Sequence, residues 1–73
     1  MLKKKYKVIF KKELDKDLKE QRQHLLIQLR YFYEKKELAF NKKDYNTGIY
    51  FKGKYLNTKR QLKKLSVIIK EEY

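Results

Sequence analysis

Aromatic and cationic side chains are interleaved in the stretch TGIYFKGKYLNTKRQL, from Thr47 to Leu62. Cations neutralise nucleic-acid phosphates, and aromatic rings placed among them can stack on unpaired bases. If the other apolar side chains of the stretch pack inward, three residues remain free for such contacts: Tyr50, Lys52 and Lys54. The stretch therefore predicts either a binding surface or a structural support for one.

Catalytic chemistry has few candidates in this chain. His24 is the only histidine, and there is no cysteine to act as a nucleophile or a metal ligand. Asp15, Asp17 and Glu20 each lie a few positions from a Lys or Arg, a spacing typical of helical ion pairs. No glycine-rich phosphate loop or cluster of metal ligands is present in the sequence. We therefore expect a protein that is not an enzyme and that has no catalytic residue, metal or cofactor.

The net charge of +12 comes from 21 Lys and Arg against nine Asp and Glu, and it is unevenly distributed. Residues 1–12 hold six Lys and no acid, residues 13–40 hold six acids and six bases, and residues 41–73 hold nine bases and three acids. AT-rich coding explains Lys in place of Arg and, with the small size, indicates a phage or mobile-element origin. It does not explain cations over anions. The pattern predicts a neutral scaffold between two cationic parts that bind a polyanion.

Length and hydropathy limit the architecture. The 73 residues predict a single small domain over residues 1–73, which would bury about 60% of its unfolded surface and would gain stability from a partner. Apolar runs reach only three residues, as in Leu25–Ile27, whereas a membrane span needs about 20. The absence of cysteine fits a reducing compartment. We expect a cytoplasmic protein without a membrane partner.

Hydrophobic periodicity predicts an α+β fold in the order strand, long helix, hairpin, helix. Alternation over Lys5–Phe10 indicates a short N-terminal strand, and helical spacing over Glu13–Asn41 indicates a long central helix. Ile49 to Leu56 alternates around Gly53 and predicts a β-hairpin, followed from Asn57 or Thr58 by a C-terminal amphipathic helix. An all-α helical hairpin is the alternative. It is supported by a heptad seam of six residues: Phe51, Tyr55, Thr58, Leu62, Leu65 and Ile69.

The long helix has two apolar faces. One stripe, about 100° wide, forms the core face, and a second, narrower face contains Ile27, Tyr31 and Leu38. A helix of about 28 residues spans roughly 42 Å, longer than a compact domain of this size. Three outcomes are open: a break near Glu34–Glu37, burial of the second face within this chain, or a homodimer interface. We favour the homodimer.

The predicted nucleic-acid-binding residues lie in an N-terminal arm, the hairpin and the basic face of the C-terminal helix. They are Lys3, Lys4, Lys5, Lys7, Tyr50, Lys52, Lys54, Lys59, Arg60, Lys63 and Lys64. With only three Arg in the chain, and Arg the usual reader of guanine edges, we expect phosphate contacts and modest sequence specificity.

The segment KYKVIFKKELDKDLKE, Lys5 to Glu20, resembles the opening strand and helix of RelE/ParE-type toxins. That resemblance covers 16 residues and implies a helical hairpin followed by a multi-stranded sheet that acts on ribosome-bound mRNA. The last 15 residues depart from this pattern because they are predicted to be helical. No catalytic residue is transferred from the family.

The sequence supports hypotheses from three different classes of function. The first is a small basic accessory or regulatory protein that binds DNA or RNA, as a homodimer. The second is an interaction module that docks on a larger machine, such as a polymerase or ribosome, through Ile27, Tyr31 and Leu38. A ribonuclease toxin of the RelE/ParE type ranks below both.

Overall fold

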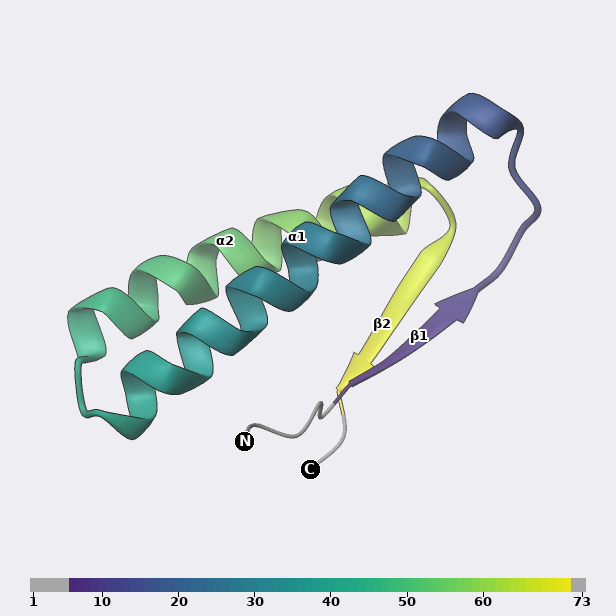
Figure 1. Cartoon of the computed structure of the whole chain (residues 1–73). Coiled ribbons are helices and arrows are strands. Elements are labelled where there is room, and N and C mark those ends of the chain that lie inside the picture. The colour runs from purple at the N-terminus through teal and green to yellow at the C-terminus, as the bar shows by residue number, and fades with distance from the viewer. Residues whose placement is uncertain (1–5, 72–73) are drawn as a thin grey trace.

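A computed structural model describes residues 6–71 of the chain and shows two helices with a two-stranded sheet (Figure 1). The elements follow the order β1 (Tyr6–Phe10), α1 (Lys16–Asn41), α2 (Tyr45–Lys64) and β2 (Val67–Glu71). The helices form a hairpin, and the strands that flank it in sequence meet beside it. The α+β prediction is confirmed, as are the N-terminal strand and the long central helix.

The two helices are joined by a three-residue turn. Lys43 adopts a left-handed conformation at φ 62°, and the Lys42 and Lys43 amides donate to carbonyls at the end of α1. The Asp44 carboxylate then accepts a hydrogen bond from the Thr47 amide at 3.4 Å, so Asp44 caps α2. This turn chemistry reverses the chain and sets the helices side by side.

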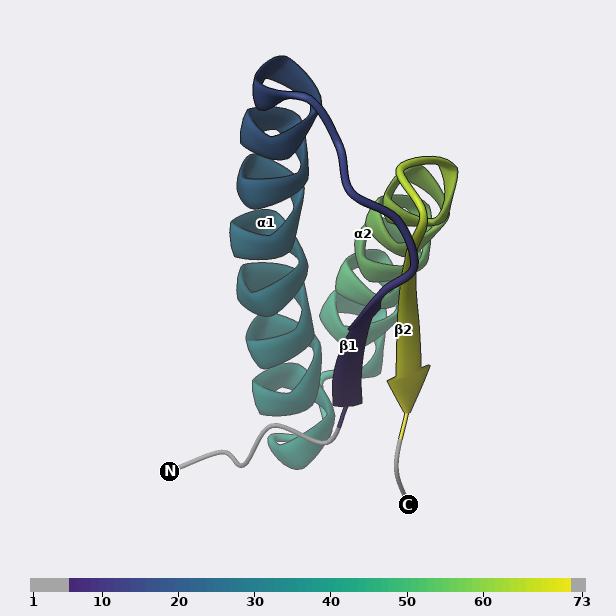
Figure 2. The ribbon, with the colours of Figure 1, turned by 90° about the vertical axis from the view of Figure 1, so that its right-hand side faces the viewer.

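The sheet pairs the beginning of the described chain with its end. β1 and β2 are antiparallel, with Tyr6 opposite Glu71, Val8 opposite Ile69 and Phe10 opposite Val67. The Lys11 amide extends the ladder by donating to the Ser66 carbonyl at 2.8 Å. Figure 2 shows the two strands in front of the gap between the helices, with β2 nearer α2. One face of the sheet packs on the helices and the other faces outward.

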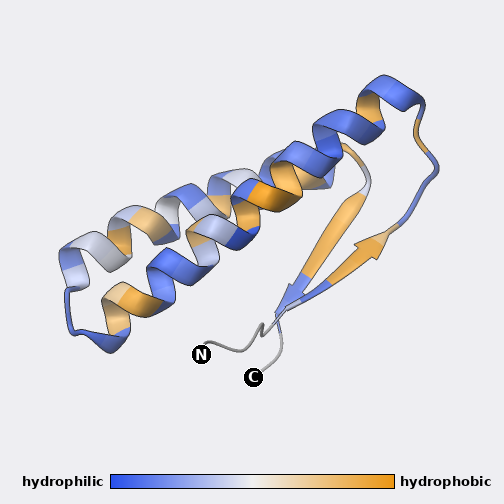
Figure 3. Ribbon diagram, in the orientation of Figure 1, coloured by the Kyte–Doolittle hydropathy of each residue, from blue (hydrophilic) through white to orange (hydrophobic). Residues whose placement is uncertain are grey.

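The core lies between the sheet and the helical hairpin. Leu29, Leu62 and Val67 are its fully buried side chains. A cluster of three buried tyrosines adds to it, with ring centroids of Tyr6 and Tyr33 5.0 Å apart and those of Tyr33 and Tyr55 5.6 Å apart. Along the strands, hydrophobic residues occupy the end of β1 and the beginning of β2, whereas the beginning of β1 and the end of β2 are hydrophilic, and on the helices they appear as separate patches (Figure 3).

The predicted hairpin at residues 49–56 is wrong, because this segment is the middle of α2. The buried face of α2 follows the alternative heptad seam through Tyr55, Thr58 and Leu62. Gly53 is helical, without a positive φ. Packing of that seam against α1 outweighs the local β preference of Ile49 to Phe51 and the cost of a helical glycine.

The predicted C-terminal helix is only partly present. α2 ends at Lys64, Ser66 takes a left-handed φ of 62°, and residues 67–71 form β2. The β-branched run Val67–Ile69 satisfies its backbone by pairing with β1, which local periodicity does not reveal. The alternative of an all-α fold is excluded by the same strand.

The expected conflict between helix length and domain size does not arise. α1 is a single continuous helix of 26 residues, without a break at Glu34–Glu37, and it begins at Lys16 rather than Glu13. The molecule is elongated, with principal extents of 41 × 21 × 18 Å, so its long axis accommodates the helix. Helix length alone therefore gives no argument for a second chain.

Candidate nucleic-acid interface

Helix α2 carries six cations and no acid along its 20 residues. Lys52, Lys59 and Lys63 follow one another at steps of seven and four, so they form one row along the helix. Arg60 stands beside this row, and Lys64 ends the helix. The cations of the last turn also interact favourably with the negative end of the helix dipole, which stabilises the helix C-terminus.

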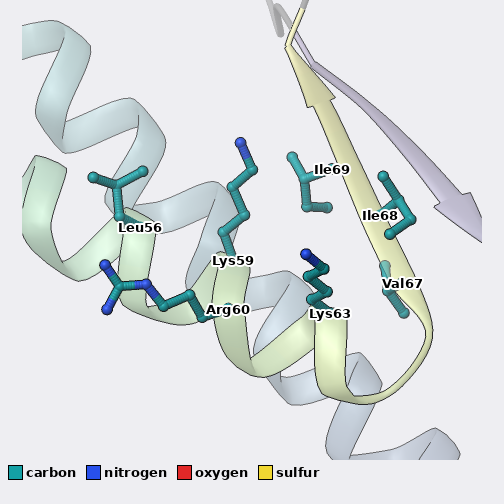
Figure 4. Close-up of a pocket in the computed structure, with 7 residues that line it drawn as sticks. All are labelled: Leu56, Lys59, Arg60, Lys63, Val67, Ile68 and Ile69. Atoms are coloured by element: carbon teal, nitrogen blue, oxygen red, sulfur yellow. The ribbon is translucent and has the colours of Figure 1, made fainter.

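A shallow pocket of about 360 Å³ lies between this row and β2. We call it the cationic groove, and its lining residues are Leu56, Lys59, Arg60, Lys63, Val67, Ile68 and Ile69. In Figure 4 the side chains of Lys59 and Lys63 extend along the gap between α2 and β2, whereas Arg60 extends away from β2. The groove has an apolar floor and a cationic wall, and none of its lining residues is aromatic.

One cation of the groove is already paired. Lys59 Nζ lies 3.3 Å from Glu71 Oε1, and the Tyr55 hydroxyl donates to the same oxygen at 3.0 Å. Burial, followed by the hydrogen bond to the Glu71 carboxylate, raises the pKa of Tyr55 well above its usual range. The Lys59 ammonium group is therefore already engaged within the protein, and Arg60 and Lys63 are the better candidates for phosphate contacts.

The outward face of the sheet adds a second group of cations. Lys7 and Lys70 are directly opposite each other in the register, and both are exposed. Ile9 and Ile68 form the neighbouring pair on this face. Like charges directly opposite each other repel across a strand pair. An anion bound over the sheet would relieve that repulsion.

The fold thus joins the two cationic parts of the sequence. β1 comes from the N-terminal part and β2 from the C-terminal part, and Lys11 is hydrogen-bonded to Ser66 one turn after Lys63. The sheet, the groove and the last turn of α2 together make up the region that carries these cations. We call it the cationic surface, and its members are Lys7, Lys11, Lys59, Arg60, Lys63, Lys64 and Lys70.

The structure separates the predicted binding residues into three groups. Lys7, Lys59, Arg60, Lys63 and Lys64 belong to the cationic surface, and Lys52 continues its row toward the middle of α2. Tyr50 and Lys54 lie on another flank of α2, where Lys54 Nζ is 5.5 Å from the Tyr50 ring centroid. Lys3, Lys4 and Lys5 lie outside the described residues.

Two members of this surface, Lys11 and Lys70, are not among the predicted binding residues, although both lie in the predicted cationic parts of the chain. Lys70 falls within the segment predicted to be the C-terminal helix, but in the structure it lies on a strand opposite Lys7. The run VIIK offered a local signal, since two Ile and a Val in succession favour a strand over a helix. The proximity of Lys11 to α2 depends on strand pairing and has no local signal.

The predicted interface residues lie apart from the cationic surface. Ile27, Tyr31 and Leu38 are 60%, 52% and 42% exposed on α1, so none of the three is buried within the described part of the chain. The Tyr31 ring leans toward α2, with its centroid 6.4 Å from that of Phe51. We call these three residues the α1 stripe.

Other kinds of site find no support among residues 6–71. His24 is exposed on α1, and no group of three or more His, Asp or Glu side chains that could hold a metal ion occurs there. Neither α1 nor α2, the two described helices, is long and apolar enough to cross a membrane. Among residues 6–71, the surface offers exposed cations and little chemistry of another kind.

Comparison with protein-family models, with curated proteins and with solved structures gave no match. The order strand, helical hairpin, strand agrees with what the RelE/ParE resemblance implies for the start of that fold. The resemblance implies a multi-stranded sheet, whereas the sheet in residues 6–71 has two strands. The agreement therefore concerns the arrangement of elements and carries no activity.

Proposed function

We propose that this protein binds DNA or RNA as a small accessory or regulatory protein, through phosphate contacts on the cationic surface. The observation that carries the proposal is the strand register, which places Lys7 opposite Lys70 and so joins both cationic parts of the chain beside the acid-free helix α2. Cations that gather on one side of a fold against their mutual repulsion are typical of a polyanion site.

The chemistry of the surface favours phosphate contacts over base stacking. The groove lining contains no aromatic ring, and the outward face of the sheet presents Ile9 and Ile68 beside its cations. Base stacking, which gives many single-strand binders their affinity, therefore has no platform here. We expect binding that depends steeply on salt and discriminates weakly between sequences.

A salt series with labelled duplex DNA, single-stranded DNA and structured RNA tests this proposal. Lys63→Gln should weaken binding at low salt and reduce the slope of log affinity against log salt by about 1, because one phosphate contact is lost. Arg60→Gln should act in the same way. Absence of binding to all three ligands at low salt would end the proposal.

Lys42→Gln is the matched control. Lys42 is exposed in the turn between α1 and α2, at the opposite end of the helical hairpin from the cationic groove (Figure 1). This variant removes the same single charge from the molecule but leaves the cationic surface intact. If Lys42→Gln weakened binding as much as Lys63→Gln, attraction would depend on net charge alone and the proposed site would be wrong.

A further inference from the structure

We propose that the α1 stripe binds a second copy of this chain, with the two α1 helices antiparallel across a two-fold axis. This inference concerns self-association and does not depend on nucleic-acid binding. The stripe consists of Ile27, Tyr31 and Leu38, separated by steps of four and seven, so the three side chains lie on one side of the helix. Since Leu29 is fully buried, that side is opposite the core.

The charges of the two helices favour α1 over α2 as the surface on which two copies of the chain meet. Between Lys16 and Asn41, α1 has six cations and four carboxylates, whereas α2 has six cations and no carboxylate. Two copies that met through α2 would bring like charges together. Two copies that met through α1 could pair charges of opposite sign, and the cationic surfaces would stay free.

An antiparallel register fits the stripe. If the two-fold axis passes between positions 32 and 33, Ile27 of one copy meets Leu38 of the second copy. Tyr31 then lies opposite Glu34 of the second copy, within reach of a hydrogen bond from the phenol to the carboxylate. The helix dipoles of the two α1 helices also oppose each other in this arrangement.

The flank of the stripe supplies matching charges. Arg30 Nε lies 3.1 Å from Glu34 Oε1 within the chain, and both side chains are mostly exposed. Tyr33, the neighbour of Glu34 in sequence, packs on Tyr6 of β1 with 5.0 Å between the ring centroids, so this flank of α1 borders the sheet. Equivalent flanks meet in an antiparallel helix pair, so Arg30 of each copy would approach Glu34 of the other. The interface would then exchange an internal ion pair for a reciprocal one.

This arrangement has a geometric consequence for the cationic surface. The two-fold axis is perpendicular to the plane of the two α1 helices, so it leaves both sheets on the same side of that plane. The dimer would present two copies of the Lys7–Lys70 pair on one face. A polyanion long enough to reach both copies would be held at two points.

Sedimentation equilibrium of the full chain, over a series from low to high micromolar concentration, tests the proposal without any ligand. The wild type should pass from monomer to dimer, and Ile27→Glu should raise the dissociation constant at least tenfold. Ile49→Glu is the control, because Ile49 on α2 is 62% exposed and Ile27 is 60% exposed. Both substitutions place a carboxylate at an exposed helical position, and circular dichroism confirms that each variant is folded.

Two outcomes of this experiment overturn the proposal. One is a wild type that stays monomeric throughout the series, which would leave the α1 stripe to a different protein. The other is an equal loss of self-association in Ile27→Glu and Ile49→Glu, which would place the contact elsewhere or make it nonspecific.

Cross-linking tests the register itself. The chain has no cysteine, so Ile27→Cys and Leu38→Cys each introduce a single thiol. Under oxidising conditions a mixture of the two variants should form disulfide-linked dimers faster than either variant alone, because position 27 meets position 38 only in the antiparallel pair. Faster cross-linking of either variant with itself, or equal rates in all three samples, would rule out this register.

Discussion

The phenol of Tyr55 and the carboxylate of Glu71 connect helix α2 to the end of strand β2, with 3.0 Å between Tyr55 Oη and Glu71 Oε1. Lys59 Nζ completes the group at 3.3 Å from the same oxygen. Tyr55 is buried within the tyrosine cluster, so its hydroxyl depends on this acceptor. The contact fixes the end of the sheet that is farthest from the Ser66 turn.

Removal of this hydroxyl should destabilise the protein. Tyr55→Phe keeps the buried ring but loses the hydrogen bond to a charged acceptor, so the free energy of unfolding should fall by about 1–3 kcal/mol. Urea denaturation followed by circular dichroism measures the effect. Tyr45→Phe is the control, since Tyr45 is 57% exposed and a surface substitution should change stability by less than about 0.5 kcal/mol. Equal effects of the two substitutions would show that the Tyr55 hydroxyl contributes nothing specific.

Stability should also fall at alkaline pH. Burial raises the pKa of both Tyr6 and Tyr55 above the ordinary tyrosine value of 10.0, so in the folded state these phenols keep their protons where unfolded tyrosine loses them. Unfolding above about pH 10 therefore releases protons, and the stability present below this pH is progressively lost as the pH rises. Urea denaturation from pH 8 to 11 measures the decline. Tyr55→Phe should make the fall in stability with pH less steep. An unchanged slope would show that the Tyr55 phenol does not cause the fall.

The two glycines of α2 should respond oppositely to alanine. A Cβ at Gly48 would lie 2.5 Å from the Phe40 ring, whereas a Cβ at Gly53 would have no neighbour within 4 Å. Gly48→Ala should destabilise the protein by about 1–3 kcal/mol through overpacking. Gly53→Ala should stabilise it by about 1 kcal/mol through helix propensity. Thermal unfolding distinguishes the two, and Phe40→Leu should partly rescue Gly48→Ala if the ring causes the cost.

At Lys70, a substitution that stabilises the protein should weaken its binding to nucleic acid. Lys70→Glu replaces a like-charge pair with an opposite-charge pair across from Lys7, which should stabilise the sheet by about 0.5–1 kcal/mol. The same change removes a cation from the cationic surface and adds a carboxylate, so affinity for nucleic acid should fall. Denaturation and the salt-series binding assay measure the two effects, with Lys70→Gln as the neutral intermediate. A stabilised variant with undiminished affinity would exclude the sheet from the interface.

Local hydrophobic periodicity was sufficient to predict β1 and α1, because each shows the regular spacing of its own kind of secondary structure. The alternation of Tyr6, Val8 and Phe10 predicted β1, and the helical spacing around Leu25 and Leu29 predicted α1. The helical wheel also separated the α1 stripe from the core face, but it left open whether the stripe is buried within this chain, and the structure shows its three residues exposed.

The second half of the chain was harder because two periods compete there. Ile49, Tyr50 and Phe51 favour a strand locally, but Tyr55, Thr58 and Leu62 continue a heptad that only contact with α1 rewards. The helical spacing of Leu62, Leu65 and Ile69 then hid β2. The partner that decides for a strand is β1, at the other end of the described chain. The cationic surface depends on this pairing and was predicted only in its separate parts.

The pairing of β1 with β2 also sets an order of events in folding. Their contact closes a loop that contains both helices, so the entropy of loop closure makes it unfavourable until α1 and α2 have docked. The helical hairpin, with its three-residue turn, is local and can form first. We expect amide protons of the sheet to exchange with solvent faster than those in the middle of the helices, through partial unfolding that separates the strands. Each such opening would part Lys7 from Lys70, so a bound polyanion would slow this exchange and act as a clamp on the last step of folding.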